Sequence, residues 1–550
     1  MKRSFLLIVC VLFSIINISC KNQDAVSNLL DIESIPERII KTGDITVVGE
    51  GQAVTIRYEL PDTINDSDVI YQWYEVKGDE EIIVENATEN QFITKPFLKK
   101  GNISYFRCKV FNNDTKQEMD SSKISVIGYS GLPILFIDTK DGSDVEDREN
   151  WKEMNLTLLS NKYGNITIGG KIKGRGNTSW YFPKKPYTIK FSDNQSLLGM
   201  NEGKKFVLVN NYIDKSLLRN SFVSYIGNNI FNSHWQPSFE FCDVIFNGEY
   251  KGVYILGESI KIDKKRIDIQ SLKKTVLGNG KDLNKDGIID KEDGGFICEV
   301  NNKFDENYNF SINSSFPIVS LKDPDTDDFS IWTDELENYI LEKTTAADAV
   351  LHEENWLDKE LGYENKFDVD SFVDWYLTNE FVKNADSVAG PSIYFYYNPA
   401  DDKIHFGPNW DFDACCGQYK GWFTDYDLYS PEGLWVLGGY KKRGDITVST
   451  EWINRLFQDP SFVSIVKNRW NTKKALLYEA INTIIDNYVT EINVSAKLNF
   501  MLYPILGKKI LNDYEAPDYE KRLNYQDEVD YLLVWLNDRY VWFDNAINSL

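Results

Sequence analysis

Residues 407–413 read Gly-Pro-Asn-Trp-Asp-Phe-Asp, and residues 384–386 upstream of them read Asn-Ala-Asp. Asp411 and Asp413 stand two positions apart, so on an extended segment their carboxylates point to one face and can share a metal ion. Asp386 ends a helix predicted over residues 369–385, where it could accept a proton from a hydroxyl nucleophile. Each aspartate alone is more often a helix cap or turn residue. The order of the groups along the chain is what favours a catalytic site.

The sequence around these aspartates changes character along the chain. From residue 131 to about 269 it alternates in the short runs that predict strands. After a Gly/Asp-rich insert, apolar residues recur at three- and four-residue steps, as in Phe372, Trp375 and Tyr376, and again over 456–477 and 478–502. We therefore predict an α+β domain over residues 132–545, with a β-rich lobe followed by a helical lobe.

A separate β-rich segment precedes this domain, over residues 32–127. Its runs, such as 53–58, 69–74 and 103–110, have the period of two and the turn spacing of a β-sandwich. Trp73 and Cys108 stand where an immunoglobulin-type domain places its core tryptophan and second cysteine, and the segment resembles such a domain. Ile56 occupies the place of the partner cysteine, which predicts an apolar core without a cross-link. The expected role is a spacer.

Composition excludes several classes of protein. The chain has 550 residues, of which 42% are hydrophobic and 26% charged, as in globular proteins. The formal net charge of −24 and the pI near 4.7 argue against a nucleic-acid partner held by its phosphate backbone. Aromatic residues make up 14%, which fits either a β-rich core or a surface that contacts sugars.

The N-terminus is typical of an exported bacterial lipoprotein. Lys2 and Arg3 precede an apolar run from residue 5 to 16, and a small residue stands before Cys20. We predict a signal peptide over residues 1–20, a lipid anchor on Cys20, a linker over 21–31 and a location in the cell envelope, at the outer membrane or cell surface. Plain secretion is the alternative. The other cysteines are too few and too irregularly spaced for a disulfide scaffold or a cysteine zinc site.

Residues 282–293 carry a calcium-loop pattern with oxygen side chains at positions 1, 3, 5, 9 and 12 and a glycine at position 6. The glycine permits the sharp turn that folds the ligands inward. The predicted calcium ligands are Asp282, Asn284, Asp286, the backbone of Ile288, Asp290 and Asp293. A solvated acidic turn is the alternative, and a structural role is favoured over a sensor.

A glycine-containing turn, Gly174-Arg-Gly-Asn-Thr-Ser-Trp180, lies between two predicted strands and is followed by Lys184 and Lys185. Small residues with free backbone N–H groups beside lysines can form a phosphate cradle. Such a turn is more often just a hairpin, so by itself it is weak evidence. The chain contains no Walker A string, which excludes the P-loop class.

Several strings together resemble the CotH kinase family of spore-coat-type atypical protein kinases. They run collinearly over about residues 132–470 and comprise 175–179 (RGNTS), 184–187 (KKPY), 198–200 (LGM), 208–214 (LVNNYID), 217–220 (LLRN), 246–254 (FNGEYKGVY), 294–299 (GGFICE), 379–380 (NE), 384–386 (NAD) and 407–413 (GPNWDFD). The resemblance implies a two-lobed kinase-like fold that binds ATP with Mg or Mn and phosphorylates protein Ser/Thr hydroxyls.

The resemblance also implies residue roles. Asp386 would be the catalytic aspartate, and Asp411, with Asp413 beside it, would hold the magnesium ion. The residues expected at the nucleotide are Arg175, Asn177, Ser179, either or both of Lys185 and Lys190, and Glu258 at the strand leading to the hinge.

Two departures from ordinary kinases keep a second function open. No asparagine follows Asp386 at the spacing of the second metal ligand, and residues 217–231 contain no glutamate to pair with a lysine. The alternative is a catalytically inactive kinase-like surface lipoprotein that binds glycans or proteins. Its binding surface would use the β-sandwich and the aromatic residues Trp410, Tyr419, Trp422, Phe423, Tyr426, Tyr429 and Trp435.

Overall fold

The computed structural model describes residues 38–550 except 302, 305–306, 314–315, 326–331, 389, 421–424 and 444–445. The predictions for the signal peptide, Cys20, the linker and the first residues of the sandwich lie outside these residues. The chain forms two compact units, a smaller one of residues 38–44, 51–98 and 104–126 and a larger one of residues 45–50, 99–103 and 127–550. Both strands and helices are present, so the predicted α+β class is confirmed.

The smaller unit consists of strands. β1 (Ile39–Lys41), β3 (Thr55–Arg57) and β6 (Gln91–Ile93) form one sheet, while β4 (Val69–Lys77) pairs with β5 (Glu80–Ile83) and β7 (Ile103–Asn112), and β7 with β8 (Glu118–Ser121). Trp73 lies opposite Cys108 in the antiparallel β4–β7 pair, and both side chains are buried. Trp73 also packs on Phe92 with ring centroids 4.8 Å apart. The core is thus apolar and aromatic, with Cys108 as a free thiol.

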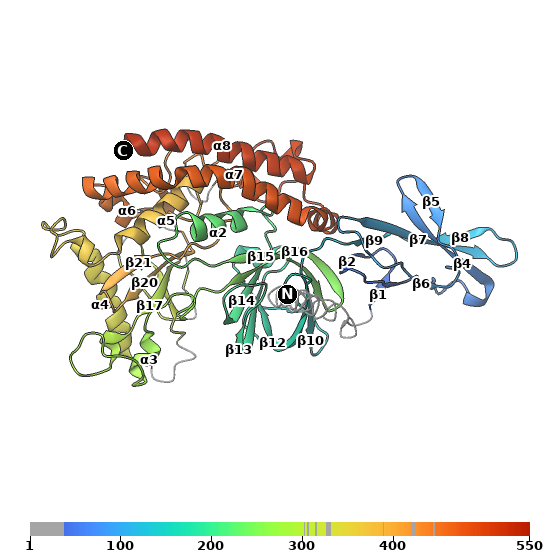
Figure 1. The fold of residues 1–550 in the computed structure, drawn as a ribbon, viewed down its shortest axis with the longest axis horizontal. Coiled ribbons are helices and arrows are strands. Elements are labelled where there is room, and N and C mark those ends of the chain that lie inside the picture. The colour runs from blue at the N-terminus through green and yellow to red at the C-terminus, as the bar shows by residue number, and fades with distance from the viewer. Residues whose placement is uncertain are drawn as a thin grey trace, which may run out of the picture. The chain divides into compact units, whose positions relative to one another are not determined.

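A closed barrel begins the main part of the larger unit (Figure 1). Its strands are β10 (Ile134–Thr139), β11 (Lys152–Leu159), β12 (Ile166–Gly174), β13 (Tyr187–Gln195), β14 (Gly203–Val209), β15 (Phe239–Phe246) and β16 (Glu249–Glu258). Their order is β10-β11-β12-β13-β14-β16-β15, and the parallel pairing of β10 with β15 closes the barrel. Alternate residues, such as Met154, Leu156 and Leu158 of β11, face the interior.

A second, antiparallel sheet follows, with the order β18-β19-β17-β20-β21. Its strands are β17 (Phe296–Val300), β18 (Asn309–Phe310), β19 (Val319–Asp323), β20 (Ile393–Asn398) and β21 (Lys403–Phe406). A hairpin of β22 (Tyr440–Arg443) and β23 (Ile446–Ser449) lies further along the chain, and β2 (Ile45–Val47) and β9 (Ser125–Gly128) are short strands near the boundary of the two units.

Most helices follow the strands in the chain. They are α2 (Arg219–Asn229), α3 (Leu272–Val276), α4 (Asp334–Val350), α5 (Val369–Val382), α6 (Glu451–Leu456), α7 (Pro460–Leu502) and α8 (Tyr525–Ser549). α5 is buried almost along its whole length, and its buried residues include the polar Ser371, Asp374, Thr378, Asn379 and Glu380. α7 and α8 lie side by side, as the orange and red helices of Figure 1 show.

Helix α7 differs from the prediction, because the two runs at 456–477 and 478–502 form one helix of 43 residues after a short α6. Asp459 caps it by accepting a hydrogen bond from the Ser461 N–H at 2.8 Å, and Pro460 is pre-set for the first turn. Near its other end, Asn499 Oδ1 accepts a hydrogen bond from the Lys184 ammonium at 2.7 Å. Lys184 also donates to the Val253 carbonyl of β16, so it fastens α7 to the barrel.

The cysteines and the helices of the described residues bear on two predictions about disulfides and membrane spans. All of their cysteines, Cys108, Cys242, Cys298, Cys415 and Cys416, are buried free thiols. None of the helices in the described part of the chain is long and apolar enough to cross a membrane.

Candidate active site

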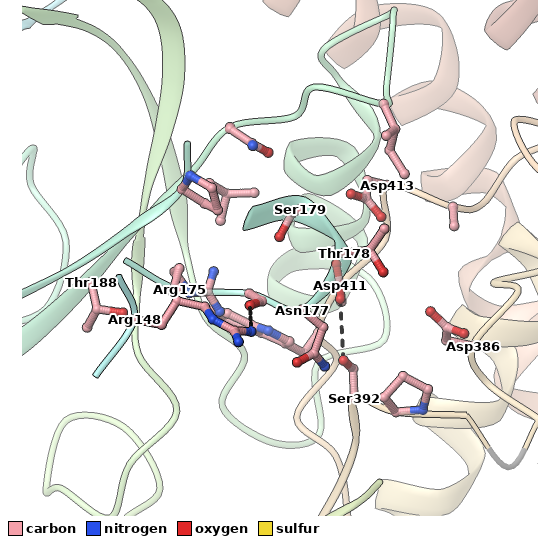
Figure 2. Close-up of a pocket in the computed structure, with 18 of the residues that line it drawn as sticks. Arg148, Arg175, Asn177, Thr178, Ser179, Thr188, Asp386, Ser392, Asp411 and Asp413 are labelled. Carbon is pink, nitrogen blue, oxygen red and sulfur yellow. Dashed lines mark hydrogen bonds between the residues drawn. The ribbon is translucent and has the colours of Figure 1, made fainter. Parts of the chain in front are cut away.

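One pocket of about 610 Å³ in the larger unit contains most of the predicted site residues. Its lining includes Arg175, Asn177, Ser179, Asp386, Asp411 and Asp413. Figure 2 shows Arg148 and Arg175 at one side of the pocket and Asp386 at the other. Side chains more than 200 positions apart in the sequence therefore share one cavity.

The turn after β12 brings Arg175, Asn177 and Ser179 to the pocket. At Gly174 a Cβ atom would lie 2.4 Å from the Trp180 ring, and at Gly176, whose φ is +82°, it would lie 2.1 Å from Ser179 Oγ. Both positions therefore require glycine. The Arg148 guanidinium donates to the Gly176 carbonyl at 2.8 Å, and Arg175 stands 5.2 Å from the centroid of the Trp410 ring.

Asp386 follows the end of α5, where Lys383 takes the left-handed conformation and stops the helix. Asn384 Oδ1 accepts the Asp386 N–H at 3.3 Å, and the Asn384 amide donates to Asn379 Oδ1 at 3.3 Å. The Asn379 amide in turn donates to Asn409 Oδ1 at 2.8 Å. This buried asparagine chain fixes the position of Asp386 relative to the 407–413 segment.

Asp411 and Asp413 reach the pocket from that segment. Phe412 between them is buried, and its N–H donates to Asn220 Oδ1 at 2.8 Å. Asp411 has a φ of +67°, a left-handed conformation that aspartate tolerates better than most residues. Strained backbone of this kind clusters at functional sites. Its Oδ2 accepts a long hydrogen bond from the Ser392 hydroxyl at 3.4 Å (Figure 2).

The electrostatics of the pocket disfavour its carboxylates as isolated anions. Enclosure by protein, followed by repulsion from Asp386, raises the pKa of Asp411 to about 6, although the Arg175 guanidinium opposes this shift. The pKa of Asp413 is raised well above its usual range, first by desolvation and then by the charges of Asp411 and Asp386. Both side chains keep solvent contact through the pocket. A bound cation would favour their charged forms.

The pocket also holds charged residues that the sequence did not single out. Glu299 and Lys322 line it and form an ion pair at 3.0 Å. Lys441 is not among the residues that line the pocket, but its buried ammonium lies 3.3 Å from Asp386 Oδ1. Glu299 is the last residue of the family string at 294–299, so the sequence contained a signal for this position. The lysines lie on other strands, and only the sheet pairing brings Lys322 near Glu299.

Three of the residues predicted at the nucleotide do not line the pocket. Lys185 donates to the Trp180 carbonyl at 2.7 Å and stands over the Trp180 ring, and Lys190 lies 5.9 Å from the centroid of the Trp151 ring. The Glu258 carboxylate is buried and accepts the N–H groups of Asn201 and Ser238, each at 3.0 Å. The side chains of these three residues therefore make their contacts outside the pocket lining.

The predicted calcium loop is a compact turn away from the pocket lining. Asp282 accepts the N–H groups of Lys285 and Gly287 at 2.6 and 2.9 Å, and buried Asp293 accepts those of Leu283 and Asn284 at 2.6 and 3.0 Å. The remaining predicted ligands, Asn284, Asp286, Ile288 and Asp290, lie on the same turn. The glycine at its sixth position has a φ of +92°.

The aromatic residues considered for a glycan surface are mostly buried. Trp410, Tyr419 and Trp435 are 9%, 2% and 0% exposed, and the Trp435 indole donates to the Asn384 carbonyl at 2.7 Å. Trp422 and Phe423 lie outside the described residues. The described members of this set therefore serve the core and the rim of the pocket.

A comparison with known protein families shows to which family the chain belongs. The model of the CotH kinase protein family matches residues 172–543, from β12 to α8, which is more than half of the chain. The protein therefore belongs to this family and is kinase-like. A search of curated proteins gives no match.

Proposed function

We propose that the protein transfers the γ-phosphoryl group of ATP to Ser or Thr hydroxyls of a protein substrate, with magnesium or manganese. The observation that supports this most is the single pocket in which Asp386, Asp411 and Asp413 face the Arg175 turn. Phosphoryl transfer needs positioned charges more than covalent chemistry, and a pocket with carboxylates on one side and guanidinium groups on the other supplies them.

The donor set of the pocket fits a magnesium ion. Asp411 and Asp413 offer hard oxygen ligands, and desolvation followed by repulsion between the pocket carboxylates raises their pKa values. Within the described residues, the three pocket aspartates do not bring ligand atoms within 4.8 Å of one another, so they form no closed cage. Magnesium suits such a site, since it uses one or two carboxylates with phosphate oxygens and water. When bound, it would neutralise charge on the transferring phosphoryl group.

Asp386 is the proposed proton acceptor for the substrate hydroxyl. It enters the pocket from a different element than Asp411 and Asp413, so it can serve the nucleophile while they hold the ion. The nearby Lys441 ammonium places a positive charge beside it, at 3.3 Å.

The phosphates have two sets of proposed contacts. One is the Arg175 turn with Asn177 and Ser179. The other is Lys322, which its ion pair with Glu299 holds at the pocket wall, the arrangement that the lysine–glutamate pair has in ordinary kinases. We propose Lys322 in place of Lys185 and Lys190, because neither of those lysines lines the pocket. The aromatic rings of Phe239 and Trp410, 5.6 Å apart, offer an apolar wall for the adenine.

Calcium at the 282–293 loop and a lipid anchor on Cys20 complete the proposal. The loop keeps the oxygen spacing that calcium requires, and the anchor would hold the protein at the cell envelope.

The decisive experiment is phosphate transfer from γ-labelled ATP with magnesium or manganese, scored as autophosphorylation. We expect label on the wild type and a loss of about 10²- to 10⁴-fold in Asp386→Ala, the usual contribution of a catalytic base. Asp193→Ala, an exposed aspartate on the barrel, is the matched control and should label normally.

Failure of labelling would favour the second function. If neither the wild type nor the control is labelled, and calorimetry finds no nucleotide binding, the protein is a kinase-shaped binding lipoprotein. The search would then move to glycan or protein ligands.

A further inference from the structure

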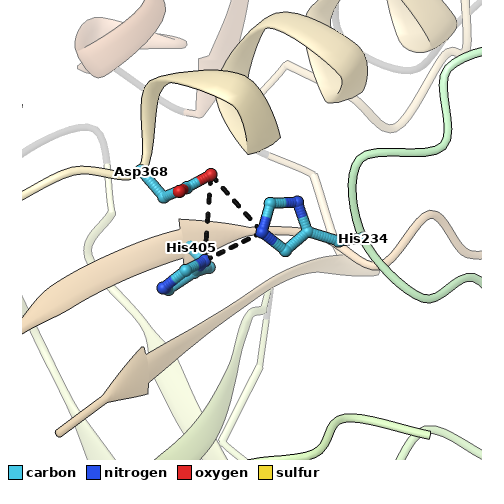
Figure 3. A group of neighbouring side chains, drawn as sticks. All are labelled: His234, Asp368 and His405. Carbon is cyan, nitrogen blue, oxygen red and sulfur yellow. Dashed lines mark hydrogen bonds and ion pairs between the residues drawn. The ribbon is translucent and has the colours of Figure 1, made fainter. Parts of the chain in front are cut away.

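Two of the three histidines meet outside the pocket, next to one aspartate (Figure 3). His234 lies between α2 and β15, Asp368 caps the N-terminus of α5, and His405 is on β21. His405 Nδ1 is 3.1 Å from His234 Nε2, and Asp368 Oδ1 is 3.4 Å from His234 Nε2 and 3.8 Å from His405 Nδ1. In the described part of the chain, no other three His, Cys, Asp or Glu residues bring their ligand atoms within 4.8 Å.

The outer nitrogen of His405 has a hydrogen-bond acceptor. His405 Nε2 lies 3.0 Å from Asp401 Oδ2, and because a carboxylate can only accept, the ring N–H at Nε2 donates this hydrogen bond. In the neutral ring the inner nitrogen, Nδ1, then carries a lone pair. A carboxylate behind the outer nitrogen of a histidine is the usual support of a metal ligand.

The same reasoning applies to His234. Its Nδ1 lies 3.0 Å from the Ser233 hydroxyl oxygen, and that hydroxyl donates to the Asp370 carbonyl at 3.4 Å. The hydroxyl oxygen is therefore free to accept the Nδ1 proton, which leaves a lone pair on Nε2. In these tautomers, two ring lone pairs and Asp368 Oδ1, which also accepts the Ser371 N–H at 2.8 Å, face one another at contact distance. A cation between them would bind all three atoms, whereas the other tautomer of His234 would place a single proton there.

We propose that His234, Asp368 and His405 form a binding site for a divalent transition metal, with Zn²⁺ as the ion. Tetrahedral zinc with bonds of ~2.0–2.1 Å separates its ligand atoms by about 3.3 Å, and the three distances here average close to that value. Two imidazoles with one carboxylate suit zinc rather than magnesium or calcium. The side chains of His234 and Asp368 are 23% and 25% exposed, so water can supply the fourth ligand.

The site would act as a structural clamp behind the pocket. The loop of His234 continues to Gln236, whose Oε1 accepts the Asn409 N–H at 2.7 Å. β21 ends at Phe406, and the chain continues from there through Asn409 to Asp411. An ion that joins His234 to His405 therefore closes a ring through the Gln236–Asn409 hydrogen bond, and Asp411 follows two residues after that ring. Its ligands do not line the pocket itself.

Metal analysis of the purified full-length protein tests the proposal without reference to kinase activity. After zinc loading and exhaustive dialysis, we expect about one zinc per chain in the wild type and under a tenth of that in His234→Gln/His405→Gln. His352→Gln is the matched control, because His352 also lies near two carboxylates, at 3.8 and 3.7 Å, and should leave zinc content unchanged. Cobalt reconstitution should give the visible bands of a tetrahedral site in the wild type and control alone.

A second variant separates a metal site from a hydrogen-bonded cluster and guards against misfolding. Asp401→Asn keeps all three ligands but weakens the support of His405, so zinc affinity should fall about 10- to 100-fold while the circular dichroism spectrum is retained. Absence of bound zinc in the loaded wild type overturns the proposal. Retention of zinc and of the cobalt bands by the double variant overturns it as well.

Discussion

Aspartates of the 282–293 loop and those of the pocket differ in the partners that they meet. In the loop, backbone N–H groups surround the carboxylates, as Asp282 shows by accepting two and Asp293 by accepting those of Leu283 and Asn284. In the pocket, Asp411 accepts a long hydrogen bond from Ser392 and faces the charges of other carboxylates. Carboxylates bonded to their own turn hold that turn together, whereas carboxylates that face one another repel and favour binding of a proton or a cation.

The strongest test of this contrast removes one carboxylate from the pocket. Asp411→Ala should weaken magnesium-dependent nucleotide binding by about 30-fold, since a contact between charged groups contributes about 1.5–3 kcal/mol. Titration calorimetry with a non-hydrolysable ATP analogue measures it. Asp286→Ala, which removes a loop carboxylate, should bind nucleotide as the wild type does. Equal loss in both variants would erase the distinction.

The positive side of the pocket gives the next effect. Lys322→Met should weaken nucleotide binding about 10-fold, because hydrogen bonds to charged groups contribute about 1.5–3 kcal/mol. Lys185→Met is its control, since the Lys185 ammonium bonds the Trp180 carbonyl outside the pocket lining. The same calorimetric titration compares them. A larger loss of nucleotide affinity in Lys185→Met than in Lys322→Met would indicate that Lys185, in the family string 184–187, contacts the phosphates instead.

Magnesium affinity of the pocket should depend on pH. The pKa of Asp411 is raised to about 6, so below that pH a proton competes with the ion, and affinity should fall about fivefold between pH 6 and pH 5. Without metal the sign reverses, and protonation of Asp411 adds stability as pH falls from about 6 towards 4. Magnesium titrations at pH 5, 6, 7 and 8 measure the profile. Asp411→Asn should flatten it, and a flat wild-type profile from pH 5 to 7 would contradict the assignment.

The smallest expected effect belongs to the loop. Calcium returned after chelation should raise the melting temperature by at least ~2 °C. Calcium at 100 times its dissociation constant increases the free energy of unfolding by about 2.7 kcal/mol. Asp286→Ala should lose most of the shift, and Asp411→Ala should keep it. Differential scanning calorimetry resolves the three proteins. No calcium response in the wild type would leave the loop as a solvated turn.

Local patterns predicted much of the molecule. The α+β class followed from the change of period along the chain, and the strings at 175–179, 384–386 and 407–413 named six residues that now share one pocket. Asp411 and Asp413 both line it with buried Phe412 between them, although Asp411 is left-handed, with a φ of +67°, and not extended as the spacing argument assumed. Short strings succeed because each of them is a single turn or strand end.

What the sequence did not predict depends on pairing between distant segments. Lys322 joins Glu299 only because β17 and β19 are neighbours in the sheet. Lys190 shares the outer face of β13 with Thr188, which does line the pocket, but it lies two residues further along and beside Trp151. The His234–His405 contact joins residues that are 171 positions apart. The spacing of apolar residues along the sequence contains no information about contacts between such distant segments.

Helix α7 has a mechanical consequence. At 1.5 Å per residue its 43 residues extend about 64 Å, with no proline after its first turn. One end is tied to α5 by ion pairs of Arg469 with Asp370 and Asp374, and the other is tied to the barrel through Asn499 and Lys184. A beam anchored at both ends resists bending, so the barrel that carries Arg175 and the helical layer that carries Asp386 should move together. We therefore expect α7 to keep the width of the pocket constant, because it limits motion of the barrel relative to the helical layer.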